Sequence, residues 1–242
     1  MKLTVASYNI LHGENDELRQ QGMHVIDLDR TAETIRALKA DICGLNEVRN
    51  QNGEGLCNQA EVIAEKLGMH VFFAKAIHIQ NGEYGNALLS RYPIRAAYTV
   101  PIQTTAQERG DRTHFEDRVL LVATLDVQGN PLTVMVCHFG LQDIEKEKAI
   151  ALLRQEVEKV DTPLIFMGDL NLTPDTAYYR ELTSFLQDSC EETSAAVYTF
   201  ARSERSCKID YIFTNSACRV RLFGVAEIGV SDRLPIRAEI EF

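Results

Sequence analysis

The chain has 242 residues, 45% of them hydrophobic, which suffices for one large domain with a sizeable core. Its 35 acidic and 25 basic residues give a net charge of −10, so a broad electrostatic surface for nucleic-acid backbones is not expected. No run of about 18 apolar residues exists to span a membrane, and no linker rich in Gly, Ser or Pro divides the chain. We therefore predict a single domain over residues 1–242 with no membrane span.

The N-terminal third alternates between strand and helix patterns. Residues 3–10 form a β-rich run that reaches Asn9, and residues 41–48 carry a second apolar run into Glu47. After each run, apolar residues recur at helical spacing, and the second helix is expected to end at Gly68, a suitable C-cap. The residues that set this spacing are Leu28, Ala32, Ile35, Leu38, Val62, Ile63 and Leu67.

The middle of the chain turns largely to strands. Strand-forming runs occur at residues 71–73, 87–89, 119–122 and 132–136. The last run leads to His138, and a histidine at a strand end is more often structural than catalytic. A charged amphipathic helix is then predicted from Asp143 to about Val160. Its expected buried face consists of Ile144, Ala151, Leu152 and Val157.

The stretch from Pro163 to Asn171 is the most informative part of the sequence. Its apolar part, residues 163–167, is too short for a helix and is bounded by Pro and Gly, so it predicts a central strand covered on both faces. Asp169 and Asn171 follow, and residues two apart on an extended chain face the same way. Residues 173–175 then suit a helix start. This pattern fits a ligand site at the carboxyl end of a strand or, as the alternative, an Asx turn.

Two more polar positions lie near the C-terminus. Asp210 interrupts the apolar strand at residues 208–213, and Ser231, Asp232 and Arg233 follow later in the chain. Groups of types that bind metals or transfer protons thus stand at the ends of several strands. We interpret this recurrence as one site assembled from those strands.

Seven short motifs follow one another along the chain, and each of them alone is weak. They are Tyr8-Asn9, Leu45-Asn46-Glu47-Val48, Gly85-Asn86-Ala87-Leu88-Leu89-Ser90-Arg91-Tyr92-Pro93-Ile94, His138-Phe139-Gly140-Leu141, Gly168-Asp169-Leu170-Asn171, Ile209-Asp210-Tyr211-Ile212, and Ser231-Asp232 with Pro235. In this order, they resemble the endonuclease/exonuclease/phosphatase superfamily, which has the DNase I-like fold. The resemblance implies an α/β protein that forms a four-layer α/β/β/α sandwich, with two mixed β-sheets flanked by helices.

The resemblance also implies a hard divalent cation held by oxygen ligands. Glu47 would be the main metal ligand, with Asn9 and Asp232 close by. Mg²⁺, or Mn²⁺, suits this set because hard cations prefer carboxylate, amide and water oxygens. The sequence contains no cluster of Cys and His that would suggest zinc.

Further roles around the scissile phosphate follow from the same resemblance. Asp169 would orient or deprotonate water, Asn171 would hold the phosphate, and His138 would donate a hydrogen bond to it. Asp210 corresponds to the aspartate that orients a terminal histidine in the family. Arg118 resembles an arginine that lies near the substrate.

The last motif departs from the family, because Ser231-Asp232-Arg233 replaces the family's Ser-Asp-His. Arginine cannot act as a base, since its guanidinium stays protonated and has no acceptor atom. It can bind a phosphate oxygen and stabilise developing negative charge. A bidentate ion pair between Arg233 and Asp210 is a further expectation. The alternative interpretation of Arg233 is an inactive or engineered variant.

We therefore predict a metal-dependent phosphoesterase that hydrolyses a phosphodiester or a phosphomonoester. The alternative is a catalytically impaired family member that binds metal and a phosphorylated ligand. The substrate class stays open among nucleic acid, inositol phosphate, phospholipid headgroup and small nucleotide, although strong binding of duplex DNA is not expected.

The remaining residues receive structural interpretations. Asn86 is expected to serve a turn into a strand, and His12 with the other histidines outside the motifs is expected at the surface or in loops. The six cysteines form no C-x-x-C pair, and no signal peptide is evident at the N-terminus. Reduced thiols in a cytoplasmic monomer are therefore expected.

Overall fold

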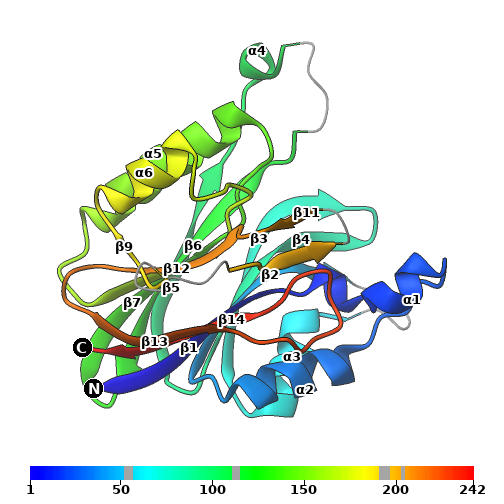
Figure 1. Ribbon diagram of the computed structural model, residues 1–242, viewed down its shortest axis with the longest axis horizontal. Helices are drawn as coiled ribbons and strands as arrows, with labels where there is room; N and C mark the ends of the chain where they lie inside the picture. Colours follow the sequence, from blue (N-terminus) through cyan, green and yellow to red (C-terminus); the bar gives the residue numbers. More distant parts are fainter. Residues whose placement is uncertain (52–56, 111–114, 191–196, 203–204) are drawn as a thin grey trace.

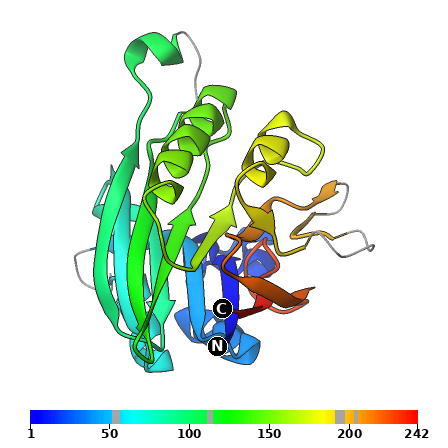
Figure 2. The same cartoon turned by 90° about the vertical axis from the view of Figure 1, so that its left-hand side faces the viewer.

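Two six-stranded β-sheets pack face to face, and helices cover both outer faces (Figures 1 and 2). This computed structural model describes residues 1–51, 57–110, 115–190, 197–202 and 205–242. The arrangement is the four-layer α/β/β/α sandwich that the sequence predicts, and both sheets are mixed.

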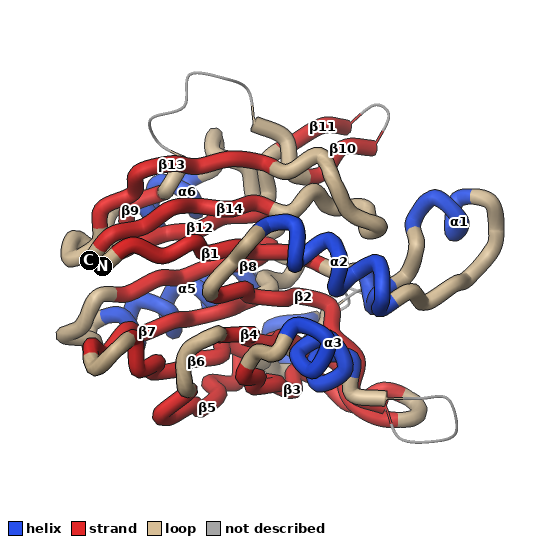
Figure 3. The backbone as a smooth tube through the Cα atoms, turned by 90° about the horizontal axis from the view of Figure 1, so that it is seen from below, coloured by secondary structure: helices blue, strands red, loops and turns tan. Residues whose placement is uncertain are grey.

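The first sheet has the strand order β13-β14-β1-β2-β4-β3. In that order its strands are Arg219–Val225, Ile236–Glu241, Lys2–Asn9, Ile42–Gln51, Gly82–Ser90 and His70–Ile79. Only β1 and β2 run parallel. The helices α2 (Leu28–Leu38) and α3 (Gln59–Leu67) lie over its outer face (Figure 3). A short turn η1 (Leu11–Gly13) and the helix α1 (Asp16–Gln20) follow β1.

The second sheet has the order β5-β6-β7-β8-β12-β9. Its strands are Ile94–Ile102, Arg118–Val127, Asn130–Cys137, Leu164–Asp169, Asp210–Thr214 and Gln187–Asp188. Only β7 and β8 run parallel. The helices α5 (Asp143–Val157) and α6 (Ala177–Thr183) cover its outer face, and α4 (Ala106–Arg109) projects from one end of the molecule (Figure 1). The strands β10 (Phe200–Arg202) and β11 (Arg205–Cys207) form a separate hairpin outside the two sheets (Figure 3).

Three apolar layers stabilise the sandwich. The central layer lies between the two sheets and includes Val5, Leu88, Val134 and Ile165. One outer layer packs α2 and α3 onto the first sheet, and the other packs α5 and α6 onto the second. The run at residues 163–167 therefore belongs to a strand, β8, that is buried along its whole length, as its composition predicts.

The helices follow the sequence prediction with two corrections. The α3 helix ends at Gly68 in the left-handed conformation, as expected for a C-cap. The buried face of α5 is predicted only in part: Leu152 and Val157 pack half-buried against the core, whereas Ala149, Ile150 and Leu153 are the buried residues and Ala151 is exposed. The α6 helix starts after an N-cap at Thr176 rather than at residues 173–175, which form a turn. Within the described ranges, no helix combines the length and the apolar character needed to cross a membrane.

Strand direction gathers the predicted polar residues at one edge of the sandwich. Asn9 ends β1, and Asp169 ends β8. The β12 strand runs antiparallel to β8, so its first residue, Asp210, pairs with Asp169. The β14 strand likewise runs antiparallel to β1, so the segment before it, which contains Asp232 and Arg233, returns to the end of β1.

Candidate active site

Glu47 lies in a β-bulge rather than in regular strand. The pairing of β2 with β4 shifts between Leu45 and Val48, and Glu47 has a φ of 58°. A positive φ at a non-glycine residue is strained and is typical of functional positions. The bulge turns the carboxylate towards Asn9, whose Nδ2 donates to Glu47 Oε1 at 2.9 Å. Burial raises the pKa of Glu47, and the charges of Asp169 and Asp232 raise it further.

Asn9 connects the two sheets through its amide group. Its Nδ2 also donates to Asp169 Oδ2 at 3.0 Å, while its Oδ1 accepts the Leu11 N–H at 3.1 Å. The amide therefore positions two carboxylates and uses its oxygen on the backbone. Contact of Asn9 with a metal stays a prediction, and in this arrangement the residue would act through the carboxylates that it positions.

Asp169 is fully buried and accepts hydrogen bonds on both carboxylate oxygens. Oδ2 accepts from Asn9 and from Nε of Arg233 at 3.1 Å, and Nη2 of Arg233 lies 2.9 Å from the same oxygen. Oδ1 accepts the backbone N–H of Asn171 at 3.1 Å. The preceding Gly168 has a φ of 151°, and a Cβ there would lie 1.8 Å from the Cys137 carbonyl oxygen. Glycine thus allows β7 and β8 to approach just before Asp169.

Asn171 fits both interpretations of the Asp169 segment, an Asx turn and a ligand site at the end of a strand. Its backbone contact with Asp169 Oδ1 is of the Asx type, and its φ is 48°. Its side chain also reaches the next strand end, since Nδ2 lies 3.1 Å from His138 Nε2 and donates to the Phe139 carbonyl at 3.0 Å. A local turn therefore places Asn171 beside Asp169 and His138 at the predicted site.

His138 is buried, and donors approach both of its ring nitrogens. Nη1 of Arg118 lies 3.3 Å from Nδ1, and Nδ2 of Asn171 lies 3.1 Å from Nε2, which also stands 3.9 Å from Asp169 Oδ2. A neutral imidazole has one N–H and accepts at only one nitrogen, so these contacts do not fix the tautomer. Burial lowers the pKa of His138 well below its usual range, and the charges of Arg118 and Arg233 add to this effect. His138 is therefore a neutral imidazole with one ring N–H to donate.

Arg233 does not form the bidentate pair with Asp210 that the sequence suggested. Its Nε stands 3.9 Å from Asp210 Oδ2, because the guanidinium turns to Asp169 and places Nη1 3.0 Å from Asp232 Oδ1. The guanidinium also stacks over the Phe200 ring at 4.4 Å. Neither carboxylate oxygen of Asp210 has a hydrogen-bond partner among the described residues. Burial, followed by the charge of Asp169, raises the pKa of Asp210 well above its usual range.

Asn46 and Asn86 form a buried amide network beneath these side chains. Asn46 donates to Asn86 Oδ1 at 2.9 Å and to the Cys137 carbonyl at 3.1 Å, and it accepts the Asp169 N–H at 2.9 Å. Asn86 in turn donates to the Val119 carbonyl at 3.0 Å. Both residues thus join the first sheet to the second. Asn86 has a structural role, as interpreted, but it lies inside β4 rather than in a turn that leads into a strand. The positioning role of Asn46 was missed.

His12 is the main residue of this neighbourhood that the sequence interpretation missed. It lies in η1, where its Nδ1 is 3.3 Å from the Glu47 carbonyl oxygen and its Nε2 is 3.7 Å from Glu47 Oε2. Its ring packs edge-on against Tyr84, with 5.3 Å between centroids. Burial, helped by the positive charge of Arg49, lowers the pKa of His12 to about 4. Its place three residues after Asn9 in a turn gave no signal of where the ring would point.

His12 should make the metal-free protein less stable in acid. Its folded-state pKa of about 4 lies below the value of about 6.5 in an unfolded chain, so the unfolded chain binds more protons between these values. Above a pH of about 6.5, the contribution of neutral His12 to the free energy of unfolding is complete. As the pH falls towards about 4, the free energy of unfolding decreases by up to about 3 kcal/mol. His12→Asn should flatten this decline, measured by urea unfolding in EDTA. Equal slopes in both proteins would contradict the buried neutral imidazole.

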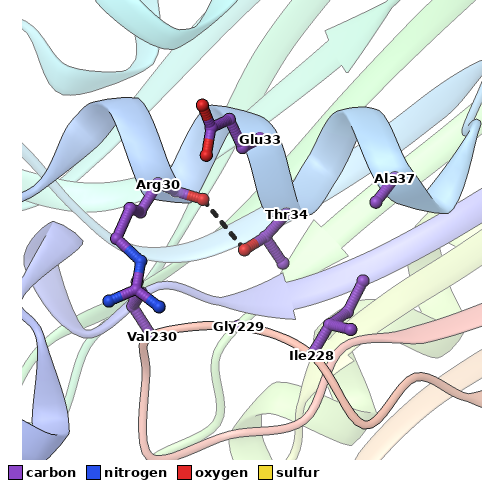
Figure 4. A pocket seen from close by; sticks show the side chains of 7 residues that line it. All are labelled: Arg30, Glu33, Thr34, Ala37, Ile228, Gly229 and Val230. Carbon is purple, nitrogen blue, oxygen red and sulfur yellow. Dashed lines mark hydrogen bonds between the residues drawn. The ribbon is translucent and has the colours of Figure 1, made fainter.

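A separate groove of about 380 Å³ lies between α2 and residues 228–230 (Figure 4). Arg30 and Glu33 line it from the helix, together with Ile228 from the facing segment. None of the predicted site residues lines it. Val230 donates its backbone N–H to the Tyr8 hydroxyl at 3.2 Å, which fixes the segment that leads to Asp232.

The comparison with known protein families agrees with this geometry. Residues 6–232 match the Endonuclease/Exonuclease/phosphatase family. The chain belongs to this family. The match includes every predicted site residue except Arg233, which stands one position beyond its end.

Known proteins resemble this family member in sequence or in fold. The uncharacterized protein YbhP of Escherichia coli K12 is 25% identical over 154 residues, which cover 60% of this chain and 58% of YbhP. The matched segment thus spans less than two thirds of that relative. A family structure from Beutenbergia cavernae DSM 12333 has a TM-score of 0.82 at 24% identity and covers 100% of this chain and 72% of its own. The mannosyl-6-phosphatase of Bacteroides thetaiotaomicron VPI-5482 has a TM-score of 0.77 at 20% identity, covering 99% and 100%.

The groups around Glu47 fit a hard divalent cation. Glu47 Oε2 accepts no hydrogen bond from the described residues, and the nearby charges of Asp169 and Asp232 disfavour its ionised form. A bound cation would relieve this repulsion. Within the described part of the chain, no three His, Cys, Asp or Glu side chains form a closed ligand set. Mg²⁺ does not require one, because it commonly uses one or two carboxylates and several waters.

Proposed function

We propose that this chain is a divalent-metal-dependent phosphoesterase that hydrolyses a phosphodiester or phosphomonoester bond. The observation that carries the proposal is the convergence of Glu47, His138, Asp169, Asn171 and Arg233 at one edge of the sandwich. Hydrogen bonds and ion pairs connect most of these side chains, and Asn9 links Glu47 to Asp169. Such a set combines oxygen ligands for a cation with donors for a phosphate.

His138 and Asn171 supply donors for phosphate oxygens. The neutral His138 carries one ring proton, and its Nε2 lies 3.1 Å from the Asn171 amide nitrogen. A neutral donor stabilises negative charge that develops on a phosphoryl oxygen without taking part in proton exchange with solvent. Arg118, whose Nη1 lies 3.3 Å from Nδ1, helps to hold the ring of His138 in place.

Arg233 would add positive charge at the same edge. Its guanidinium carries only donors, so it stabilises charge on a phosphate but does not activate water. When bound at Glu47 and Asp232, a divalent metal would neutralise phosphate charge and supply an activated water. Asp169 would orient that water, although its two oxygens already accept hydrogen bonds from Asn9, Arg233 and Asn171.

A catalytically impaired member that binds metal and a phosphorylated ligand is the second candidate. The observation in its favour is the contact between Arg233 and Asp169, which engages the carboxylate that would orient water. The carboxylate of Asp210 points the same way: it has no hydrogen-bond partner among the described residues, whereas in the family this aspartate orients a histidine.

Hydrolysis of chromogenic substrates separates the two candidates. We expect release of nitrophenol from a bis-nitrophenyl phosphate or a nitrophenyl phosphate in Mg²⁺ or Mn²⁺, and none in EDTA. Asp169→Asn, which keeps the size of the side chain, is the matched control for contaminating activity. Binding of a phosphorylated ligand in metal without any turnover would favour the impaired member.

Long duplex DNA should bind only weakly at physiological salt. The net charge of −10 repels the phosphate backbone, and affinity for duplex DNA depends on many lysines and arginines that displace counterions. We expect no complex with random-sequence duplex below about micromolar protein, the range of non-specific binding, in a fluorescence anisotropy titration. A sub-micromolar, sequence-independent complex would contradict the charge argument.

A further inference from the structure

The ring of His12 is oriented by contacts on several sides. Its Nδ1 stands 3.3 Å from the Glu47 carbonyl oxygen, its face meets the edge of Tyr84, and its own carbonyl accepts from Gln59 Nε2. A carbonyl oxygen is only an acceptor, so Nδ1 must carry the ring proton. In the neutral ring, Nε2 then presents a lone pair.

This lone pair faces another electron-donating atom. Nε2 stands 3.7 Å from Glu47 Oε2, and among the described residues neither atom has a hydrogen-bond donor within reach. Two acceptors that converge in a largely buried place repel each other unless a proton or a metal cation lies between them, and 3.7 Å is too long for a hydrogen bond. The His12 and Glu47 side chains are only 21% and 16% exposed, so solvent screens this repulsion weakly.

The spacing and the support of the ring are those of a metal-binding imidazole. Two atoms bound to one ion at about 2.1 Å each stand roughly 3.0–3.7 Å apart for angles of about 90° to 125°. Metal-binding histidines usually donate their other ring N–H to a carbonyl or carboxylate, which fixes the tautomer and the ring. The contact between Nδ1 and the Glu47 carbonyl has this form.

We propose that His12 Nε2 is a direct ligand, together with Glu47 Oε2, of the divalent ion at this site. This inference rests on the proposed function, because it adds a nitrogen ligand to the metal that Glu47 holds. Imidazole is a ligand of first-row transition metals, among which Mn²⁺ also favours carboxylate and water oxygens, whereas Mg²⁺ prefers oxygen ligands alone. The chemical class of the resident ion is therefore a transition metal that accepts both nitrogen and oxygen, such as Mn²⁺.

His12→Asn is a matched variant for the test. Asparagine tolerates the left-handed backbone at this position, where φ is 57°. Its amide N–H stands where Nδ1 stands and preserves the contact with the Glu47 carbonyl, but the side chain ends short of Nε2. A structural role of His12 is thereby kept, while the metal ligand is removed.

Electron spin echo spectroscopy of the Mn²⁺-loaded full chain tests the ligand directly. We expect ¹⁴N modulation from a coordinated imidazole in the wild type, its loss in His12→Asn, and its retention in His138→Gln. Calorimetry should show Mn²⁺ affinity falling at least about tenfold in His12→Asn, with Mg²⁺ affinity changed much less. Mn²⁺ binding that depends on Glu47 but shows no ¹⁴N modulation, or modulation that survives in His12→Asn, would overturn the proposal and leave the proposed function standing. Mn²⁺ binding that Glu47→Gln does not weaken would overturn both.

Discussion

Replacing Arg233 with histidine should raise metal-dependent phosphoester turnover by a factor within about 10²–10⁴, the usual contribution of a positioned acid or base. Histidine supplies an acceptor atom for a proton, which arginine lacks. The partner for such a histidine is already present, because Asp210 lies 3.9 Å from Arg233 Nε and neither of its oxygens has a hydrogen-bond partner among the described residues. An imidazole N–H could donate to this carboxylate and fix the ring.

The same substitution would also release Asp169. In the present structure Arg233 places two nitrogens on Asp169 Oδ2. Without them, that oxygen keeps only the Asn9 amide as a hydrogen-bond donor among the described residues and can accept a hydrogen bond from water. Turnover should therefore rise for two reasons: position 233 gains a proton acceptor, and Asp169 Oδ2 loses its contacts with the Arg233 guanidinium.

Arg233→Gln is the control that separates these effects. Glutamine removes the charge and releases Asp169 but provides no base, so its turnover should stay well below that of Arg233→His. Steady-state rates on the chromogenic phosphodiester and monoester give the comparison, with thermal unfolding scans to show that both variants fold. A loss of turnover in Arg233→His would contradict the prediction and would assign the guanidinium to substrate binding.

Glu47→Gln should abolish most divalent-metal binding and activity while the fold stays intact. Glutamine has nearly the same shape and can still accept the Asn9 amide hydrogen bond at the Oε1 position. Because burial raises the pKa of Glu47, its charge at neutral pH opposes folding in the absence of metal. The variant in EDTA should therefore be as stable as the wild type or more so.

Thermal unfolding with and without Mn²⁺ or Mg²⁺ measures this difference. The wild type should gain stability on metal addition, since a ligand that binds only the folded state stabilises it. Glu47→Gln should gain little, whereas Glu61→Gln, at an exposed position of α3, should behave like the wild type. Equal gains for the wild type and Glu47→Gln would place the metal elsewhere.

The sequence predicts the strands and the edge of the site well, because local pattern determines both. The apolar run before Asp169 has the composition of a buried strand, and parallel or antiparallel pairing then brings the strand ends together. The family match and the similar solved structures agree with the predicted α/β/β/α sandwich.

Prediction from the sequence fails where the direction of a side chain depends on tertiary packing. Arg233 could face either of two buried carboxylates. Its Nη2 lies 2.9 Å from Asp169 Oδ2, whereas its Nε lies 3.9 Å from Asp210 Oδ2, and no sequence pattern distinguishes these two arrangements. The position of His12 depends on a bulge at Glu47 and a left-handed turn at residues 11 and 12, neither of which has a sequence signature here. The buried face of α5 is predicted only in part, because Glu145, Lys146 and Glu156 are buried beside its apolar residues and obscure the periodic pattern.

The measurement that tests the central claim most directly is phosphoester turnover in the wild type and in Arg233→His, each with and without Glu47→Gln. Rates would be measured on the chromogenic phosphodiester and monoester in Mn²⁺ and in EDTA. We predict turnover in Mn²⁺ that is greater in Arg233→His, is absent in EDTA, and is lost in both proteins when Glu47 is replaced. Turnover that persists in EDTA, or that survives Glu47→Gln in either protein, would contradict a metal-dependent site at this edge of the sandwich.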